Sequence, residues 1–190
     1  MAKLLVAPVS AGLDVAAASK AFAQALGAQV FQPLDASAET LLAQGKSDDW
    51  FDAVVGKAVA LNTDKLVIEG IAPDADKLFL SGKNVELTLS LDAGVVLALQ
   101  SDNADAAEAA HRINLAKQPG LLEGFIIEGA AASVGEEVAR LTGLTFYGSS
   151  SALKDVSALA KREASRLSPA QFRYNLIDFA QKADMRIVLP

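Results

Sequence analysis

The residues best placed to hold a phosphate group lie in the first loop of the chain, after an apolar run that breaks at Pro8. Where a loop leads from an apolar strand into a helix, the first backbone N–H groups of the helix are unpaired and point toward any ligand bound above the loop. If Gly12 is the second glycine of the pattern G-x-x-x-x-G-K-[ST], Ala7 replaces the first glycine, Leu13 the lysine and Asp14 the magnesium-binding hydroxyl. No ammonium then meets the terminal phosphates, and a nearby carboxylate repels them. The loop predicts the architecture of a phosphate site without its chemistry.

A second group suited to chemistry is the carboxylate of Glu69, at the end of the apolar run 65–70. Such a run is typical of a buried parallel strand, and ligands of these sheets bind beyond the carboxyl ends of the strands. Glu69 either ligates magnesium or caps local N–H groups, and the missing lysine favours capping. We therefore expect Ser10, Gly12 and Glu69 to be the residues of a vestigial cofactor-binding site. We expect no catalytic residue, no metal site and no cofactor.

Few other side chains suit catalysis. The chain has no cysteine and one histidine, which excludes disulfides, thiolate chemistry and a multi-histidine metal site. His111 falls in a helical pattern, where a surface or packing role is expected. Trp50 lies on a periodic apolar face and is predicted to anchor the core. The basic cluster of Lys161, Arg162 and Arg166 is predicted to be a solvated helix face.

Composition limits the possible partners. The 190 residues are enough for one well-buried domain and a tail, and 52% apolar content is ample for a core. A net charge of −6, with scattered acidic residues, predicts no nucleic-acid partner and no membrane partner. No apolar run approaches the roughly 20 residues of a membrane helix, and the start of the chain has no leader pattern. We expect a cytoplasmic protein.

Periodicity predicts an alternation of strands and helices. Helices are expected over 15–26, 37–44, 50–59, 84–93, 105–117, 133–142 and 153–166. Strands are expected over 3–8, 29–32, 65–70, 94–99, 124–129 and 144–147.

Polar residues ahead of three helices are the expected N-terminal caps. They are residues 47–49, then Asp102 or Asn103, and finally the capping box of Ser133 and Glu136.

The segment 84–93 is ambiguous, because its apolar residues alternate with period two and taken alone favour a strand. A helix is predicted nevertheless. The strand 94–99 follows at once, and a right-handed crossover between parallel strands needs a helix before it.

The alternation predicts an α/β domain over residues 1–150, with a doubly wound, mostly parallel sheet and helices on both faces. The flexible run 148–151 ends this domain. A linker helix over 151–167 is expected to follow as part of a helical C-terminal appendage.

Several segments resemble a known family. The opening strand, loop and helix, the run VIEG at 67–70 and the run GFII at 124–127 resemble the N-terminal domain of long-form bacterial phosphate acetyltransferase. That domain is a dethiobiotin-synthetase-like, degenerate P-loop domain. The tail is the more specific part: LSPAQFRYNL at 167–176 and ADMRIVLP at 183–190 are similar to the entry into that enzyme's catalytic domain.

The resemblance implies that this chain is the N-terminal piece of an enzyme that converts acetyl-CoA and phosphate to acetyl phosphate and CoA. Residues 168–190 would begin the catalytic domain, and the family's catalytic residues would follow Pro190, so none is carried over. The family's usual asparagine for base recognition is replaced by Glu128. A further regulatory segment usual in the long form is missing. We expect a non-catalytic regulatory or assembly domain in a homo-oligomer, whose partner is the acetyltransferase domain of the same chain, with a small metabolite as a possible effector.

Two alternatives remain. The first is an ATP-dependent, dethiobiotin-synthetase-like ligase with an unorthodox loop, in which Lys20 or Lys46 replaces the absent lysine. Lys20 lies about two turns into the first helix, which is far for this task. The second is a plain interaction module that packs its alanine-rich helix 105–117 and its helix 153–166 on another subunit.

Overall fold

The chain begins with strand β1 (Ala2–Pro8), which is the middle strand of a parallel sheet. The computed structural model describes residues 2–101, 105–116 and 122–161. Strand β3 (Lys65–Glu69) pairs with one edge of β1 and β4 (Gly94–Gln100) with the other. The outer strands are β2 (Gln29–Phe31) and β5 (Leu122–Glu128), so the order is β2-β3-β1-β4-β5. Every pairing in this sheet is parallel, as predicted.

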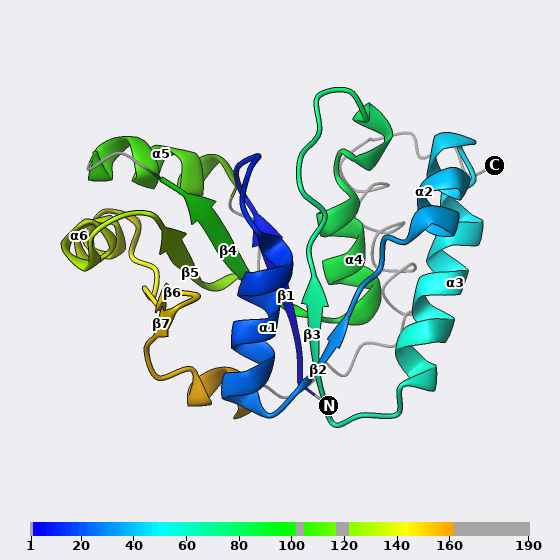
Figure 1. Cartoon of the computed structure of the whole chain (residues 1–190), viewed down its shortest axis with the longest axis horizontal. Helices are drawn as coiled ribbons and strands as arrows, with labels where there is room; N and C mark the ends of the chain where they lie inside the picture. The colour runs from blue at the N-terminus through cyan, green and yellow to red at the C-terminus, as the bar shows by residue number, and fades with distance from the viewer. Residues whose placement is uncertain (1, 102–104, 117–121, 162–190) are drawn as a thin grey trace, which may run out of the picture.

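In the described part of the chain, six α-helices connect and cover these strands (Figure 1). They are α1 (Val15–Leu26), α2 (Ala36–Ala43), α3 (Ser47–Ala60), α4 (Lys83–Leu91), α5 (Ala106–Ala116) and α6 (Ala132–Thr142). Two short 3₁₀ helices are η1 (Leu78–Leu80) and η2 (Ser157–Lys161), and a small antiparallel hairpin joins β6 (Gly148–Ser149) to β7 (Ala152–Leu153).

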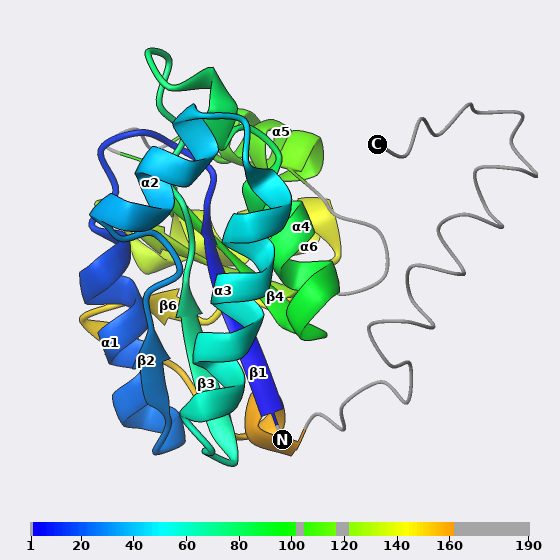
Figure 2. The same cartoon turned by 90° about the vertical axis from the view of Figure 1, so that its right-hand side faces the viewer.

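Helices lie on both faces of the sheet because successive side chains of a strand point to opposite faces. In β1, Leu4 and Val6 belong to one apolar cluster and Leu5 and Ala7 to the other. The first cluster is covered by α1 together with η2, and the second by α2 to α6. Figure 2 shows α1 and α3 on opposite sides of the sheet. The α/β class and the helices on both faces are therefore confirmed.

The ambiguous segment 84–93 is helical, as predicted, and forms α4. Leu87 and Leu91, four residues apart, are buried, whereas Val85 is 40% exposed. A spacing of four residues places both leucines on one face of a helix. Trp50 of α3 is also confirmed as a core anchor: it is fully buried, and its indole N–H donates to the carbonyl of Pro33 at 3.2 Å.

The predicted caps of three helices are wrong or untested. Helix α3 already begins at Ser47 and has no side-chain cap. Helix α6 follows Ala131, so Ser133 lies inside the helix and forms no capping box. Asp105 caps α5 by accepting from the N–H groups of Ala107 and Glu108 at 2.9 and 3.2 Å. The predicted alternatives Asp102 and Asn103 lie outside the described residues.

The predicted sixth strand over 144–147 is wrong in extent. Only Phe146 forms a bridge, with Phe125 of β5.

The predicted helix over 153–166 is also wrong for the part that the structure describes. Leu153 belongs to β7, and the chain becomes helical only in the 3₁₀ turn η2, from Ser157. Val156 and Leu159 are buried on the α1 face of the sheet. Residues 152–161 therefore complete the core of the α/β domain. Arg162, Arg166 and the expected unit 168–190 lie outside the described residues.

No described helix has the length and apolar character needed to cross a membrane. His111 is exposed on α5, as expected.

Candidate functional site

Two hollows flank the loop that leads from β1 to α1, at the carboxyl edge of the sheet. Helix α1 covers one face, whereas α4 and α5, which follow β3 and β4, cover the other. The chain therefore leaves β1 toward one face of the sheet, and it leaves the two neighbouring strands, β3 and β4, toward the other face. Such a reversal opens a crevice where ligands of parallel α/β sheets commonly bind.

The first hollow, here called the acidic cleft, has a volume of about 300 Å³. It is lined by residues 13–16 at the start of α1, by 32–34 after β2 and by 69–72 after β3. Its charged side chains are Asp14 and Glu69, and the described lining includes no lysine or arginine. An anion entering the cleft would therefore meet two carboxylates and no cation.

Asp14 is the N-cap of α1. Its Oδ1 accepts from the N–H of Ala17 at 2.9 Å, and the N–H of Val15 donates to the carbonyl of Leu13. Two of the first three amides of α1 are thus already hydrogen-bonded within the chain. The helix terminus that could hold a phosphate is occupied by its own carboxylate.

Leu13 stands where the phosphate-binding lysine would be, and its side chain is buried. It is 7% exposed and belongs to the apolar cluster beneath α1, together with Val15 and Phe22. A lysine at this position would start from the core side of α1. Leu13 also borders the acidic cleft, but its apolar side chain offers no charge to a phosphate there.

Glu69 lies beside the loop of Gly12, as expected from neighbouring strands, because β1 and β3 pair with Val6 opposite Glu69. Its Oε1 accepts from Nε2 of Gln32 at 3.3 Å. Gln32, whose backbone leads from β2 into Pro33, was not singled out from the sequence. Its position just beyond the end of β2 is the feature of the sequence that could have indicated it as a site residue.

Gly70 follows Glu69 and allows the chain to pass close to β1. A Cβ on Gly70 would lie 2.2 Å from the carbonyl oxygen of Val6 and 2.7 Å from Cδ of Pro8. Because the carbonyl belongs to the backbone, no side chain can move aside to make room. This close approach fixes the floor of the acidic cleft.

The second hollow, here called the polar hollow, lies at the carboxyl ends of β1 and β4 and has a volume of about 390 Å³. Residues 10–11 and 100–101 line it, with Asp105, Glu108, Ala109 and Arg112 from one face of α5. Ser10 is 7% exposed, and its hydroxyl accepts from the N–H of Gln100 at 2.9 Å.

The three predicted site residues do not share one hollow. Glu69 lines the acidic cleft and Ser10 the polar hollow, while Gly12 contributes a left-handed φ of +84° to the turn of the loop between them. The set Asp105, Glu108 and Arg112 was missed. Its spacing on one helix face, directly after the carboxyl end of β4, could have indicated it.

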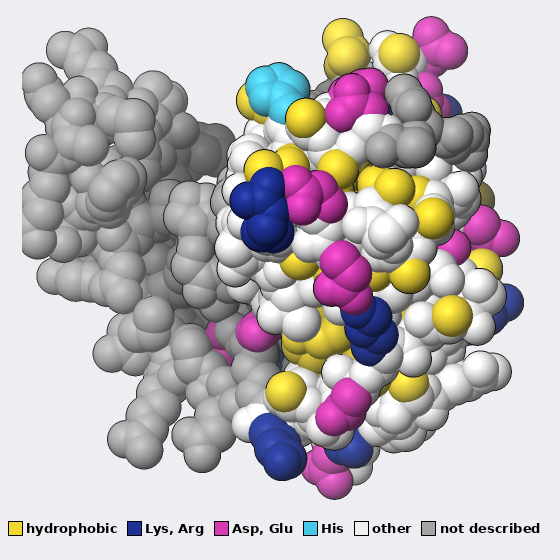
Figure 3. Space-filling model, turned by 90° about the vertical axis from the view of Figure 1, so that its left-hand side faces the viewer, with side chains coloured by type: hydrophobic (Ala, Val, Ile, Leu, Met, Phe, Trp, Pro, Cys, Tyr) yellow, Lys and Arg dark blue, Asp and Glu magenta, His cyan; other side chains and the backbone are white. Residues whose placement is uncertain are grey.

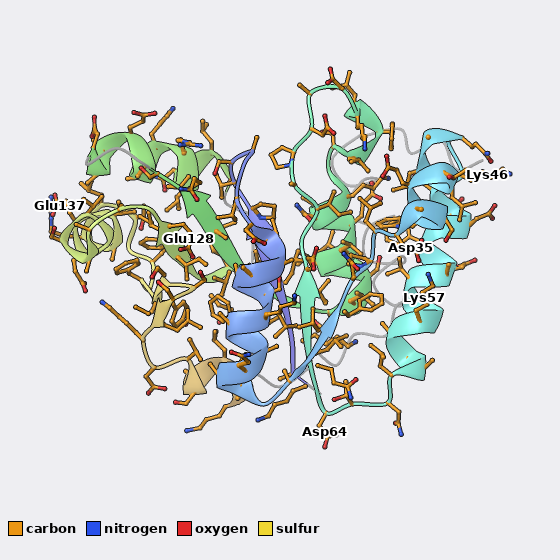
Figure 4. All side chains as sticks on the ribbon, viewed as in Figure 1. Asp35, Lys46, Lys57, Asp64, Glu128 and Glu137 are labelled. Atoms are coloured by element: carbon orange, nitrogen blue, oxygen red, sulfur yellow. The ribbon has the colours of Figure 1, made fainter. Side chains whose placement is uncertain are left out.

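Neither lysine proposed as a substitute cation is among the described residues that line the acidic cleft or the polar hollow. Lys20 is exposed on α1, and Lys46 is exposed at the turn between α2 and α3 (Figure 4).

Glu128, at the carboxyl end of β5, binds the backbone of the hairpin. Its Oε1 accepts from the N–H of Ser150 at 2.6 Å. The same hairpin is tied to α6, because Lys154 of the segment after β7 pairs with Glu136. Glu128 therefore holds residues 148–153 against the sheet.

A comparison with models of known protein families finds no match to this chain, and a comparison with curated protein sequences finds none either. The fold and the site define an α/β protein with a five-stranded parallel sheet, and the described residues that line the acidic cleft beside its first loop include no lysine or arginine.

Proposed function

We propose that this chain is a non-catalytic regulatory or assembly domain of the dethiobiotin-synthetase-like P-loop type. The observation that carries the proposal is that the described lining of the acidic cleft, which includes Leu13 and Asp14, has no lysine or arginine. A nucleotide kinase or ligase needs positive charge at the terminal phosphates in the transition state. The acidic cleft offers Asp14 and Glu69 instead.

The catalytic partner in this proposal is a phosphate acetyltransferase domain on the same polypeptide. Its support is the likeness of residues 167–176 and 183–190 to the entry into that domain. In this proposal the whole protein is a cytoplasmic homo-oligomer that makes acetyl phosphate and CoA, and the chain described here does no chemistry of its own.

The test is a deletion in the protein that contains this chain. Removing residues 1–161 should leave acetyl-CoA turnover with phosphate measurable, while changing its response to metabolites or its oligomeric state by light scattering. A truncated protein with the same kinetics, the same metabolite response and the same mass would contradict a regulatory or assembly role. An intact protein without acetyltransferase activity would contradict the proposed partner.

The ligase alternative has a separate test. Sustained phosphate release from ATP by the purified chain, abolished by Glu69→Ala, would support it. The exposed positions of Lys20 and Lys46, outside both hollows, give this alternative no cation at the cleft.

The interaction-module alternative relied on helix 105–117 and helix 153–166. The described part of the second segment is not an α-helix and packs into the core, so the surface left to this alternative is that of α5 with the neighbouring α6. Figure 3 shows one face of the molecule, on which acidic and basic side chains are interspersed. Leu115 of α5 is 75% exposed and Leu141 of α6 is 44% exposed. A mass that rises with concentration and falls on Leu115→Ser would favour this alternative.

A further inference from the structure

We propose that the polar hollow binds a small amino carboxylate in its zwitterionic form. The inference names a ligand class for the regulatory role proposed above and rests on that role. It concerns the β4 side of the loop, whereas a phosphate site would lie over the start of α1.

The hollow has side chains of opposite charge that do not neutralise each other. Glu108 and Arg112 are four residues apart on α5, a spacing at which acidic and basic side chains commonly pair. Yet within the described part of the chain, neither side chain forms a hydrogen bond or an ion pair. Both line the hollow. A carboxylate and a guanidinium are therefore both available to a ligand.

The charge balance selects the ligand class. A free anion would be attracted by Arg112 but repelled by Glu108 and Asp105. A simple cation would be attracted by the two carboxylates but repelled by the guanidinium. A ligand that carries both charges satisfies both groups. Its carboxylate can accept two parallel hydrogen bonds from the guanidinium, and its ammonium can donate to the carboxylate of Glu108.

The size of the ligand follows from the helix. Side chains at a four-residue spacing have Cβ atoms about 5–6 Å apart, so the two charges of the ligand must be separated by a short carbon chain. Ser10 forms the floor of the hollow. Its buried hydroxyl already accepts from the N–H of Gln100, and it can still donate its proton to a ligand oxygen.

The test is a calorimetric titration of the full chain with glycine, β-alanine, 4-aminobutanoate and 5-aminopentanoate. Butanoate and butylamine are the matched probes with a single charge. We expect at least one amino carboxylate to bind about tenfold or more tightly than either single-charge probe. Amide shifts in the NMR spectrum on binding should fall on residues 10–11 and on α5.

The variants Arg112→Gln and Glu108→Gln should each weaken this binding by about tenfold or more. Glu69→Gln, in the acidic cleft, is the control and should leave it unchanged. Because Arg112 and Glu108 lie at the surface of α5, both variants should keep the circular dichroism spectrum of the parent chain.

Three results would overturn the inference: no amino carboxylate that binds more tightly than butanoate and butylamine, unchanged binding by Arg112→Gln, or no saturable binding up to about 10 mM of any probe. Each would leave the regulatory or assembly role standing. That role fails only in the deletion experiment, so the two failures are distinguishable.

Discussion

Two neighbouring residues, Leu13 and Asp14, decide what the first loop can do. Both were recognised in the sequence as departures from a phosphate-binding pattern. Their directions were not, because a pattern of letters does not say which side chain faces the core. Leu13 is buried beneath α1, and Asp14 caps the helix.

The variant Leu13→Lys should therefore destabilise the chain without restoring nucleotide binding. Placing an unpaired ammonium among apolar side chains should lower the free energy of unfolding by about 2–4 kcal/mol. Urea unfolding measures this loss, and calorimetry with magnesium and ATP measures binding. Ala17→Lys is the control: it adds the same charge at an exposed position in the first turn of α1, with an expected loss below about 1 kcal/mol. A stable Leu13→Lys variant that binds ATP would contradict this expectation and would show that an ammonium at position 13 can reach the acidic cleft, which Leu13 borders.

Gly70 supports a second prediction at the scale of one residue. Gly70→Ala should lower the free energy of unfolding by about 1–3 kcal/mol, because the new methyl group meets the backbone of β1. Gly56→Ala is the matched control with the opposite sign. Gly56 lies inside α3 with open space at its Cβ position, so alanine should stabilise the helix by about 0.5–1 kcal/mol. Equal effects of the two variants in urea unfolding would contradict this placement of Gly70.

At the scale of elements, the positions of most strands and helices could be predicted from the sequence, and the reasons for the errors are local. The helix α4 was recognisable because the right-handed crossover requires it, despite its alternating leucines. The caps were misjudged because polar residues in the first turn of a helix look the same as polar residues before it. The three-residue spacing of Val156 and Leu159 fits a 3₁₀ turn as well as an α-helix. The pairing of Ser10 with β4, which separates it from Glu69, depends on tertiary contacts that periodicity does not report.

Helices α2 and α3 are joined by an ion pair that makes stability depend on pH. Asp35 caps α2, and the ammonium of Lys57, at 2.7 Å, holds the pKa of the Asp35 carboxyl well below its usual range, with help from the Ser37 hydroxyl and the Ala38 N–H (Figure 4). Because the pKa of the Asp35 carboxyl is lower in the folded state than in the unfolded state, this carboxyl binds a proton in the unfolded chain first as pH falls. The stabilisation is therefore present at neutral pH and is lost below about pH 4.

The variant Asp35→Asn keeps a good cap but removes the charge. Because the pair is about half exposed, the variant should be less stable than the parent by only about 0.5–1 kcal/mol at pH 7, and the difference should shrink between about pH 4 and pH 3. Lys57→Gln should flatten the pH dependence in the same way. Urea unfolding across this pH range is the measurement, and parallel curves for parent and Asp35→Asn would contradict the assignment.

At the scale of the whole molecule, the structure is an α/β domain with a five-stranded parallel sheet, and the described lining of the acidic cleft beside β1 carries two carboxylates and no lysine or arginine. The hairpin 148–153 and η2 complete the core on the α1 face, where a separate linker helix had been predicted. The molecule thus keeps a well-packed scaffold with two hollows of unlike charge beside its first loop.

The most direct measurement is a calorimetric titration of the purified chain with ATP in excess magnesium at neutral pH and moderate salt. Because the described lining of the acidic cleft has Asp14 and Glu69 but no lysine or arginine, we predict no saturable heat at micromolar concentrations of nucleotide. Saturable binding in the micromolar range, weakened by a substitution in the loop 9–14, would contradict the account.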